Sequence, residues 1–201
     1  MLLIEDSSDG YTRRHYGTAF FVRPNILLTA GHCTLGLRDP RVRLIISRPF
    51  ESGPIDLMDF VARRMETIEC SVIDSLYQKD GPGHMDISIL HSGSYSSPTF
   101  LQLSTLPVPR HGIVDIVGYP GRHSTDFILG HSGLTKPFQE CITSAETLLP
   151  AQTLTITRGI VETVGSTISY KATTCPGMSG GCLIYNGKAL GLGSFCRLLT
   201  T

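Results

Sequence analysis

A single serine lies in a glycine-rich stretch near the end of the chain, TTCPGMSGG at residues 173–181. Proline, glycine and serine are common turn residues, so such a cluster is most simply a connection between strands. Glycine also adopts backbone conformations that other residues avoid, which would let N–H groups around Gly177 converge beside the Ser179 hydroxyl. Converging amides stabilise the oxyanion that forms when a hydroxyl attacks a carbonyl group. The stretch therefore indicates either a plain turn or a nucleophile loop.

A serine nucleophile needs a general base, because its hydroxyl is almost fully protonated at neutral pH. His32 follows an apolar run in LLTAGHC (27–33), where a histidine without a partner is more often structural. Asp86 precedes an alternating apolar run in HMDISIL (84–90), and an acid at a strand edge is usually solvated. Burial of this acid against a histidine would instead serve catalysis, because the carboxylate could orient the histidine as the base. The candidate catalytic residues are therefore His32, Asp86 and Ser179.

The sequence GMSGG also satisfies the G-x-S-x-G pattern of the α/β-hydrolase nucleophile elbow. That fold places its acid and then its histidine after the serine. All seven histidines of this chain precede Ser179, and residues 180–201 contain no His, Asp or Glu. The elbow would lack a base, so the chain order disfavours an esterase or lipase.

The order of the three candidates and the segment around each resemble the chymotrypsin-like serine peptidases. The segments that carry the resemblance are GTAFFV (17–22) and LLTAGHC before the histidine, HMDISIL at the aspartate and PGMSGGCLI (176–184) at the serine. VGYPG (117–121) and YKATTCPGMSGG are most similar to the glutamyl-endopeptidase branch. The resemblance implies a serine endopeptidase in which Ser179 attacks a peptide bond, His32 transfers the proton and Asp86 holds the imidazole.

The resemblance also implies the remaining parts of the site. The oxyanion hole would be formed at Gly177, Met178 and Ser179, and the substrate pocket would be lined by Thr173, Thr174, Gly193, Ser194 and Phe195. These pocket residues offer neither an acid nor a fixed cation, and burying an unpaired charge costs several kcal/mol. We therefore expect preference for an uncharged residue before the cleaved bond. The alternative is that Arg197 folds into the pocket and favours Glu or Asp.

Two residues beside the serine bear on regulation. Met178 stands where activatable relatives carry an aspartate that pairs with a new N-terminus, and a thioether cannot form that ion pair. We therefore expect no activation by N-terminal cleavage. Pro176 is unusual beside an oxyanion glycine and would favour extended geometry at Cys175. It supports the alternative function, a non-catalytic or latent domain that acts as a binding or regulatory module.

The elements that must position these residues are β-strands. Short β-rich runs alternate with turn signals along the chain, which predicts an all-β fold. The resemblance implies two six-stranded antiparallel β-barrels, with the active site in the cleft between them. Residues 1–105 would carry the histidine and aspartate, and residues 106–201 the serine and the pocket. The three prolines of residues 98–112 are typical of a linker, and YNGK (185–188) predicts a hairpin.

Composition narrows the partners. The 201 residues carry 17 basic and 17 acidic side chains, so the net charge gives no sign of a nucleic-acid or membrane partner, and a polypeptide substrate is expected. No apolar stretch approaches the roughly 20 residues that span a bilayer. Residues 1–4 are too short for a signal-peptide core, which favours an intracellular protein unless a leader has been removed. The chain could also be a domain of a larger protein.

The six cysteines predict no metal or other cofactor. No pair has the C-x₂₋₄-C spacing of a zinc site. No cysteine precedes Cys33, so the bridge that many secreted relatives form at this position cannot exist. Cys175 and Cys196 could be bridged in an oxidising compartment. The remaining cysteines lie in apolar runs and are expected to behave as small buried hydrophobes: Cys70, Cys141 and Cys182.

Overall fold

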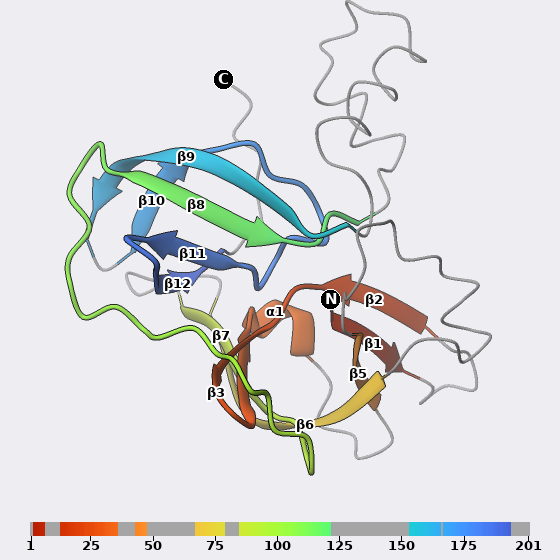
Figure 1. Ribbon diagram of the computed structural model, residues 1–201. Coiled ribbons are helices and arrows are strands. Elements are labelled where there is room, and N and C mark those ends of the chain that lie inside the picture. Colours follow the sequence, from red (N-terminus) through yellow and green to blue (C-terminus); the bar gives the residue numbers. More distant parts are fainter. Residues whose placement is uncertain are drawn as a thin grey trace, which may run out of the picture.

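Two antiparallel β-sheets hold most of the regular structure (Figure 1). The computed structural model describes residues 2–6, 13–35, 43–47, 67–78, 85–121, 153–165 and 167–193. The strands are β1 (Leu2–Asp6), β2 (Arg13–Gly17), β3 (Phe20–Arg23), β4 (Ile26–Thr29), β5 (Arg43–Ser47), β6 (Thr67–Gln78), β7 (Met85–His91), β8 (Ile113–Gly118), β9 (Thr155–Val164), β10 (Ile168–Lys171), β11 (Cys182–Tyr185) and β12 (Lys188–Leu192). The helix of the described part, α1 (Gly31–Thr34), is short and follows β4.

The first sheet has the strand order β2-β1-β5-β6-β7-β4-β3. Successive side chains of its strand β7 point to opposite faces, and the face with Ser88 and Leu90 is buried whereas Ile87 and Ile89 are half-buried. β7 pairs with both β4 and β6, which places Asp86 opposite Tyr77. The same pairing brings the end of β4, where α1 begins, beside the start of β7.

The second sheet has the order β10-β9-β8-β11-β12. Strands β11 and β12 form the predicted hairpin, since Tyr185 pairs with Lys188 across a two-residue turn. The turn residues have positive φ, 49° at Asn186 and 75° at Gly187, as a type I′ turn requires. Local sequence therefore determines this connection.

The segment between β7 and β8 runs along both sheets, as the green trace in Figure 1 shows. The amide of Leu101 donates to the carbonyl of Phe21 in β3 at 2.8 Å. The amide of Ser104 then donates to Ala189 in β12 at 2.7 Å. The predicted linker therefore pairs with an edge of each sheet, which covers backbone groups that an edge strand would otherwise expose.

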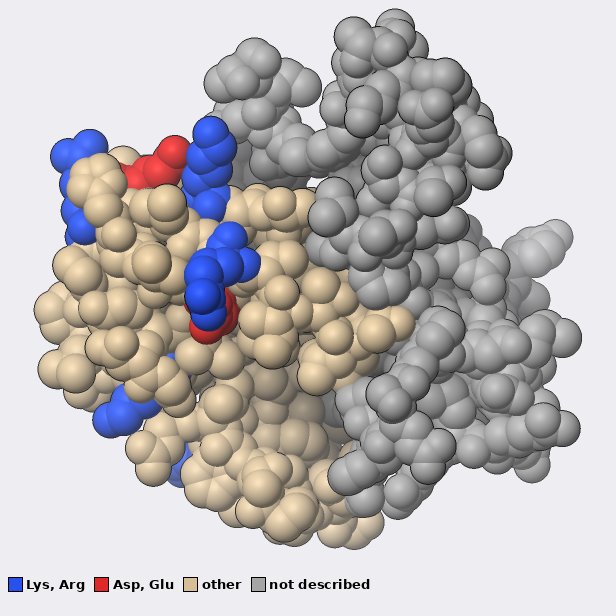
Figure 2. Space-filling model, turned by 45° about the horizontal axis from the view of Figure 1, so that its top comes forward, with Lys and Arg blue, Asp and Glu red and all other residues tan. Residues whose placement is uncertain are grey.

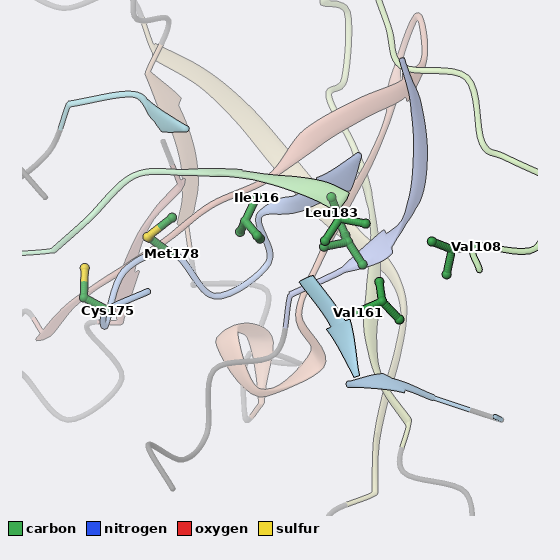
Figure 3. Packing of buried hydrophobic residues seen from close by; sticks show 7 residues of the cluster. Val108, Ile116, Val161, Cys175, Met178 and Leu183 are labelled. Atoms are coloured by element: carbon green, nitrogen blue, oxygen red, sulfur yellow. The ribbon is translucent and has the colours of Figure 1, made fainter. Parts of the chain in front are cut away.

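Each sheet has its own apolar core. The core of the first contains Leu2, Ile4, Leu27, Ile68 and Leu90. The core of the second contains Val108, Val114, Ile116, Val161, Cys175, Met178 and Leu183, most of which are labelled in Figure 3. Cys175 and Met178 lie at one end of this row of side chains and precede Ser179 in the chain. The predicted nucleophile loop is thus anchored in the second core.

The predicted all-β architecture is confirmed by these two antiparallel sheets. Its described strands divide into seven and five. The proposed domain boundary, residues 1–105 and 106–201, remains a prediction. Charged side chains are scattered among uncharged ones over the described part of the face in Figure 2, without a continuous basic field. In the part of the chain with assigned placement, no helix is long and apolar enough to cross a membrane.

Candidate active site

His32 lies on α1, directly after the buried end of β4. The end of this helical turn is held by hydroxyl groups on three elements. Thr34 bonds to Ser88 of β7, and its Oγ1 lies 3.0 Å from Oγ of Ser75 in β6. Its hydroxyl also lies 3.1 Å from the carbonyl of Gly31. These contacts tie α1 to the same two strands that carry Asp86 and Tyr77.

Both oxygens of the Asp86 carboxylate contact His32. Nδ1 of the imidazole lies 2.7 Å from Oδ2, and the backbone N–H of His32 donates to Oδ1 at 2.7 Å. The Asp86 side chain is only 4% exposed, whereas the His32 side chain is 23% exposed. A buried carboxylate therefore fixes the ring and leaves Nε2 as the nitrogen that can exchange a proton.

The electrostatics follow from this contact. The hydrogen bond to Asp86 raises the pKa of His32 from 6.5 to about 10, with a smaller contribution from the Cys33 side chain and partial burial acting against it. The carboxylate favours the imidazolium form because it is an opposite charge in direct contact. The Tyr77 ring lies edge-on to the imidazole, with ring centroids 6.1 Å apart. The surroundings of His32 thus favour its proton-bound form.

Ser179 lies beside the residues that flank His32. Its carbonyl accepts a hydrogen bond from the Thr18 amide at 2.8 Å, and the Cys33 sulfur lies 3.9 Å from the same oxygen. The next residue, Gly180, has a φ of 80°, and a Cβ there would lie 2.8 Å from the Ala30 nitrogen. The loop can approach the start of α1 so closely only with glycine at this position. Within the described segments no hydrogen bond joins the Ser179 hydroxyl to His32, a bond that often tightens only when substrate binds.

The residues before the serine form a tight turn. The Met178 amide donates to the Cys175 carbonyl at 3.2 Å, and Gly177 has a φ of 93°. Proline followed by a residue with positive φ defines a type II turn. Among the hydrogen bonds between described residues, none uses the N–H of Gly177 or of Ser179. Both amides are therefore available to a ligand.

Met178 differs from its two neighbours in the predicted oxyanion hole. Its N–H closes the turn, and its side chain is fully buried in the second core. A Cβ on Gly118 would lie 3.1 Å from the Met178 Cβ, so β8 packs closely against this side chain. Met178 therefore anchors the turn through apolar packing.

The predicted substrate pocket is only partly described. Thr173 is exposed, Thr174 is half-buried, and Gly193 is buried. Gly193 accepts a hydrogen bond from Gly180 and donates one to Gly181, both at 2.9 Å. Ser194, Phe195 and Arg197 lie outside the described residues. The pocket and its preference for uncharged side chains remain predictions.

Thr18 is a residue that the sequence patterns did not single out. Its buried hydroxyl donates to the Gly177 carbonyl at 3.0 Å and accepts a hydrogen bond from the Tyr119 amide at 2.9 Å. Its own carbonyl accepts from the Thr29 hydroxyl at 2.8 Å. The only signal in the sequence is a polar side chain at the start of GTAFFV, which is too common to indicate a role.

The described cysteines carry free thiols: Cys33, Cys70, Cys175 and Cys182. Burial raises the pKa of the last three to about 12, so these thiols stay protonated at neutral pH. Cys141, and the Cys196 that could pair with Cys175, lie outside the described residues. The described part of the chain contains no cluster of three or more His, Cys, Asp or Glu that could hold a metal ion.

Comparison with known proteins confirms the predicted chymotrypsin-like fold. Residues 17–192 match the trypsin-like peptidase domain family. No curated protein sequence matches the chain. The inactive form of the Rv3671c protease from M. tuberculosis is similar in structure, with a TM-score of 0.57 and 16% identity over 99% of this chain and 78% of that one. Human heparin binding protein, in a mutant form, has a TM-score of 0.60 and 14% identity over 98% of this chain and 78% of its own.

Proposed function

The chain belongs to the trypsin-like peptidase domain family, and we propose that it is a serine endopeptidase with Ser179, His32 and Asp86 as its catalytic triad. The observation that carries the proposal is the double contact of the buried Asp86 carboxylate with the Nδ1 and backbone N–H of His32. A histidine held in this way by a carboxylate presents Nε2 in one orientation. The adjacent position of Ser179 supplies the nucleophile.

In the proposed reaction, Oγ of Ser179 attacks the carbonyl carbon of a peptide bond while Nε2 of His32, in its neutral form, accepts the hydroxyl proton. The N–H groups of Gly177 and Ser179 would bind the oxyanion of the tetrahedral intermediate. As the C–N bond breaks, the imidazolium donates its proton to the leaving nitrogen and an acyl-enzyme remains. Water then hydrolyses the ester by the same proton transfers in reverse. Asp86 stays ionised and stabilises the imidazolium.

The proposal includes activity without N-terminal cleavage. The residue before the nucleophile is a fully buried methionine that packs in the second core. Its side chain offers no carboxylate to a new N-terminal amine. The contacts that hold the turn come instead from the apolar core and from backbone hydrogen bonds.

The alternative of a latent or non-catalytic binding domain has weaker support. One of the similar structures is that of a heparin binding protein and another is that of a protease, so similarity of fold does not decide between the two classes. The φ of Gly177 does bear on the choice, because a latent turn with an inverted Pro176–Gly177 peptide would have negative φ there. The turn geometry therefore favours a competent enzyme. The glutamyl-endopeptidase branch remains a prediction for the pocket to decide.

The test is hydrolysis of a mixed peptide library by the wild type and by Ser179→Ala. The substitution should lower kcat by about three or more orders of magnitude while the thermal unfolding curve stays the same. A fluorophosphonate probe should label the wild type and leave the variant unlabelled. Equal peptidase activity in the two proteins would contradict the assignment.

A further inference from the structure

The turn at residues 175–178 can exist in two forms. Types I and II differ mainly in the orientation of the central peptide, here Pro176–Gly177. In the type II form the Gly177 N–H faces away from the Pro176 carbonyl, toward the predicted oxyanion site. In the type I form the carbonyl would take that place. Since Met178 offers no ion pair, some other group must determine which form is populated.

A backbone hydrogen bond holds the central peptide directly. The Gly121 amide, in the loop after β8, donates to the Pro176 carbonyl at 2.7 Å. The C=O and N–H of a trans peptide point in opposite directions, so this bond turns the Gly177 N–H away from Gly121. A flipped peptide would lose the bond. The position of the loop after β8 therefore decides how well this orientation is kept.

Thr18 ties that loop to the turn. The hydroxyl accepts a hydrogen bond from the Tyr119 amide at 2.9 Å and donates one to the Gly177 carbonyl at 3.0 Å. It therefore bridges the loop that contains Gly121 and the turn that contains Pro176. The Thr18 residue is only 4% exposed, so its hydroxyl makes these bonds away from solvent. The Thr18 amide also donates to the Ser179 carbonyl at 2.8 Å. Thr18 thus contacts Gly177 within the turn and Ser179 directly after it.

We propose that Thr18 is a positioning residue that holds the oxyanion turn in its productive form, the part that an N-terminal ion pair plays in activatable relatives. We call the two hydrogen bonds of its hydroxyl, together with the bond from Gly121 to Pro176, the Thr18 latch. The latch rests on the proposed function of the site. Loss of the Thr18 hydroxyl leaves the Tyr119 amide and the Gly177 carbonyl without this partner, which loosens the loop and the turn together.

The experiment compares Thr18→Val, which keeps the shape and removes the hydroxyl, with Thr18→Ser, which keeps the hydroxyl. Thr18→Val should lower kcat at least about tenfold with little change in KM, because a transition-state contact is lost while ground-state binding remains. Thr18→Ser should restore most of kcat. The control is Ser92→Ala, which removes a buried hydroxyl that donates to the Tyr95 carbonyl at 2.7 Å in another part of the fold. It should unfold at lower temperature and keep the wild-type kcat.

A second measurement does not depend on turnover. Ligand-free crystal structures of the wild type and Thr18→Val should show positive φ at Gly177 in the first and a flipped or mixed turn in the second. An unchanged turn in Thr18→Val would overturn the latch, whatever happens to kcat. A Thr18→Val variant with the kcat of the wild type would also overturn it. Absence of Ser179-dependent hydrolysis in the wild type would instead contradict the proposed function, and the two crystal structures would still decide the latch.

Discussion

Gly177→Ala tests the turn with the smallest possible change, one methyl group. The φ of 93° is in the left-handed region, where an L-residue costs roughly 1–2 kcal/mol. The added Cβ would also lie 2.2 Å from the Gly121 nitrogen and 2.8 Å from the Tyr119 oxygen, which is a clash with backbone. The native turn therefore has no room for alanine.

The type I form relieves both problems. Its φ at this position is negative, and the cost is the hydrogen bond from Gly121 to Pro176, about 0.5–1.5 kcal/mol. This cost is smaller than the sum of strain and clash, so the variant should adopt the flipped turn. The Gly177 N–H then no longer faces the oxyanion, and loss of one such donor typically lowers kcat by roughly 10²–10³.

The assay is kcat and KM on a cleaved peptide, beside a thermal unfolding curve. The matched control is Gly187→Ala in the β11–β12 hairpin, where φ is also positive at 75° but a Cβ would meet nothing within 4 Å. The control suffers similar backbone strain and should keep the wild-type kcat. The reasoning is refuted if Gly177→Ala retains kcat close to the wild type, or if both variants lose it equally.

Four further predictions concern the pH dependence of activity, the pH dependence of stability, the core and the pocket. In a pH–rate profile, the acid limb of kcat/KM should have an apparent pKa above 6.5, because Asp86 raises the pKa of His32. Asp86→Asn should move this limb to lower pH. Because the pKa of His32 is raised in the folded state, its pair with Asp86 stabilises the fold fully below pH 6.5, and this stabilisation is lost as the pH rises through about 10. The difference in unfolding free energy between wild type and Asp86→Asn should therefore shrink over that pH range. Met178→Leu should cost less than about 1.5 kcal/mol in denaturant unfolding, whereas Met178→Asp should cost several, because it buries an unpaired carboxylate; equal costs would show that the side chain is not buried as described. Cleavage-site profiling should find an uncharged residue before the cleaved bond, and a dominant acidic residue would point to Arg197 instead.

The family resemblance was enough to predict the contact between His32 and Asp86, although 54 positions separate them. Each residue lies at the end of an apolar run, and the pairing of β4 with β7 brings these ends together. The Asn-Gly turn of the second sheet was equally predictable, because only its two residues must adopt positive φ. The turn depends on a short segment whose pattern alone determines its geometry, whereas the contact depends on the pairing of two distant strands.

The hydrogen bond from Thr18 to Gly177 could not be predicted in this way, since 159 positions separate the two residues. It arises from how the two sheets dock, and a single buried hydroxyl leaves no periodic pattern. Met178 was predicted as a member of the oxyanion hole and as a missing carboxylate. Its positive contribution, packing against β8 in the second core, requires the arrangement of the strands.

The division of the proposed site between two sheets has a consequence for its stability. His32 and Asp86 are held within the first sheet by strand pairing and by hydroxyl contacts, so their geometry does not depend on the second. The turn before Ser179 is anchored in the second core. Thr18, which precedes β3 of the first sheet, bonds through its hydroxyl to Gly177 in the turn and through its amide to Ser179. A small shift between the sheets would leave the His32–Asp86 pair intact and break the contacts of Thr18. Loss of the productive turn should therefore precede loss of the pair when the docking of the two sheets is weakened.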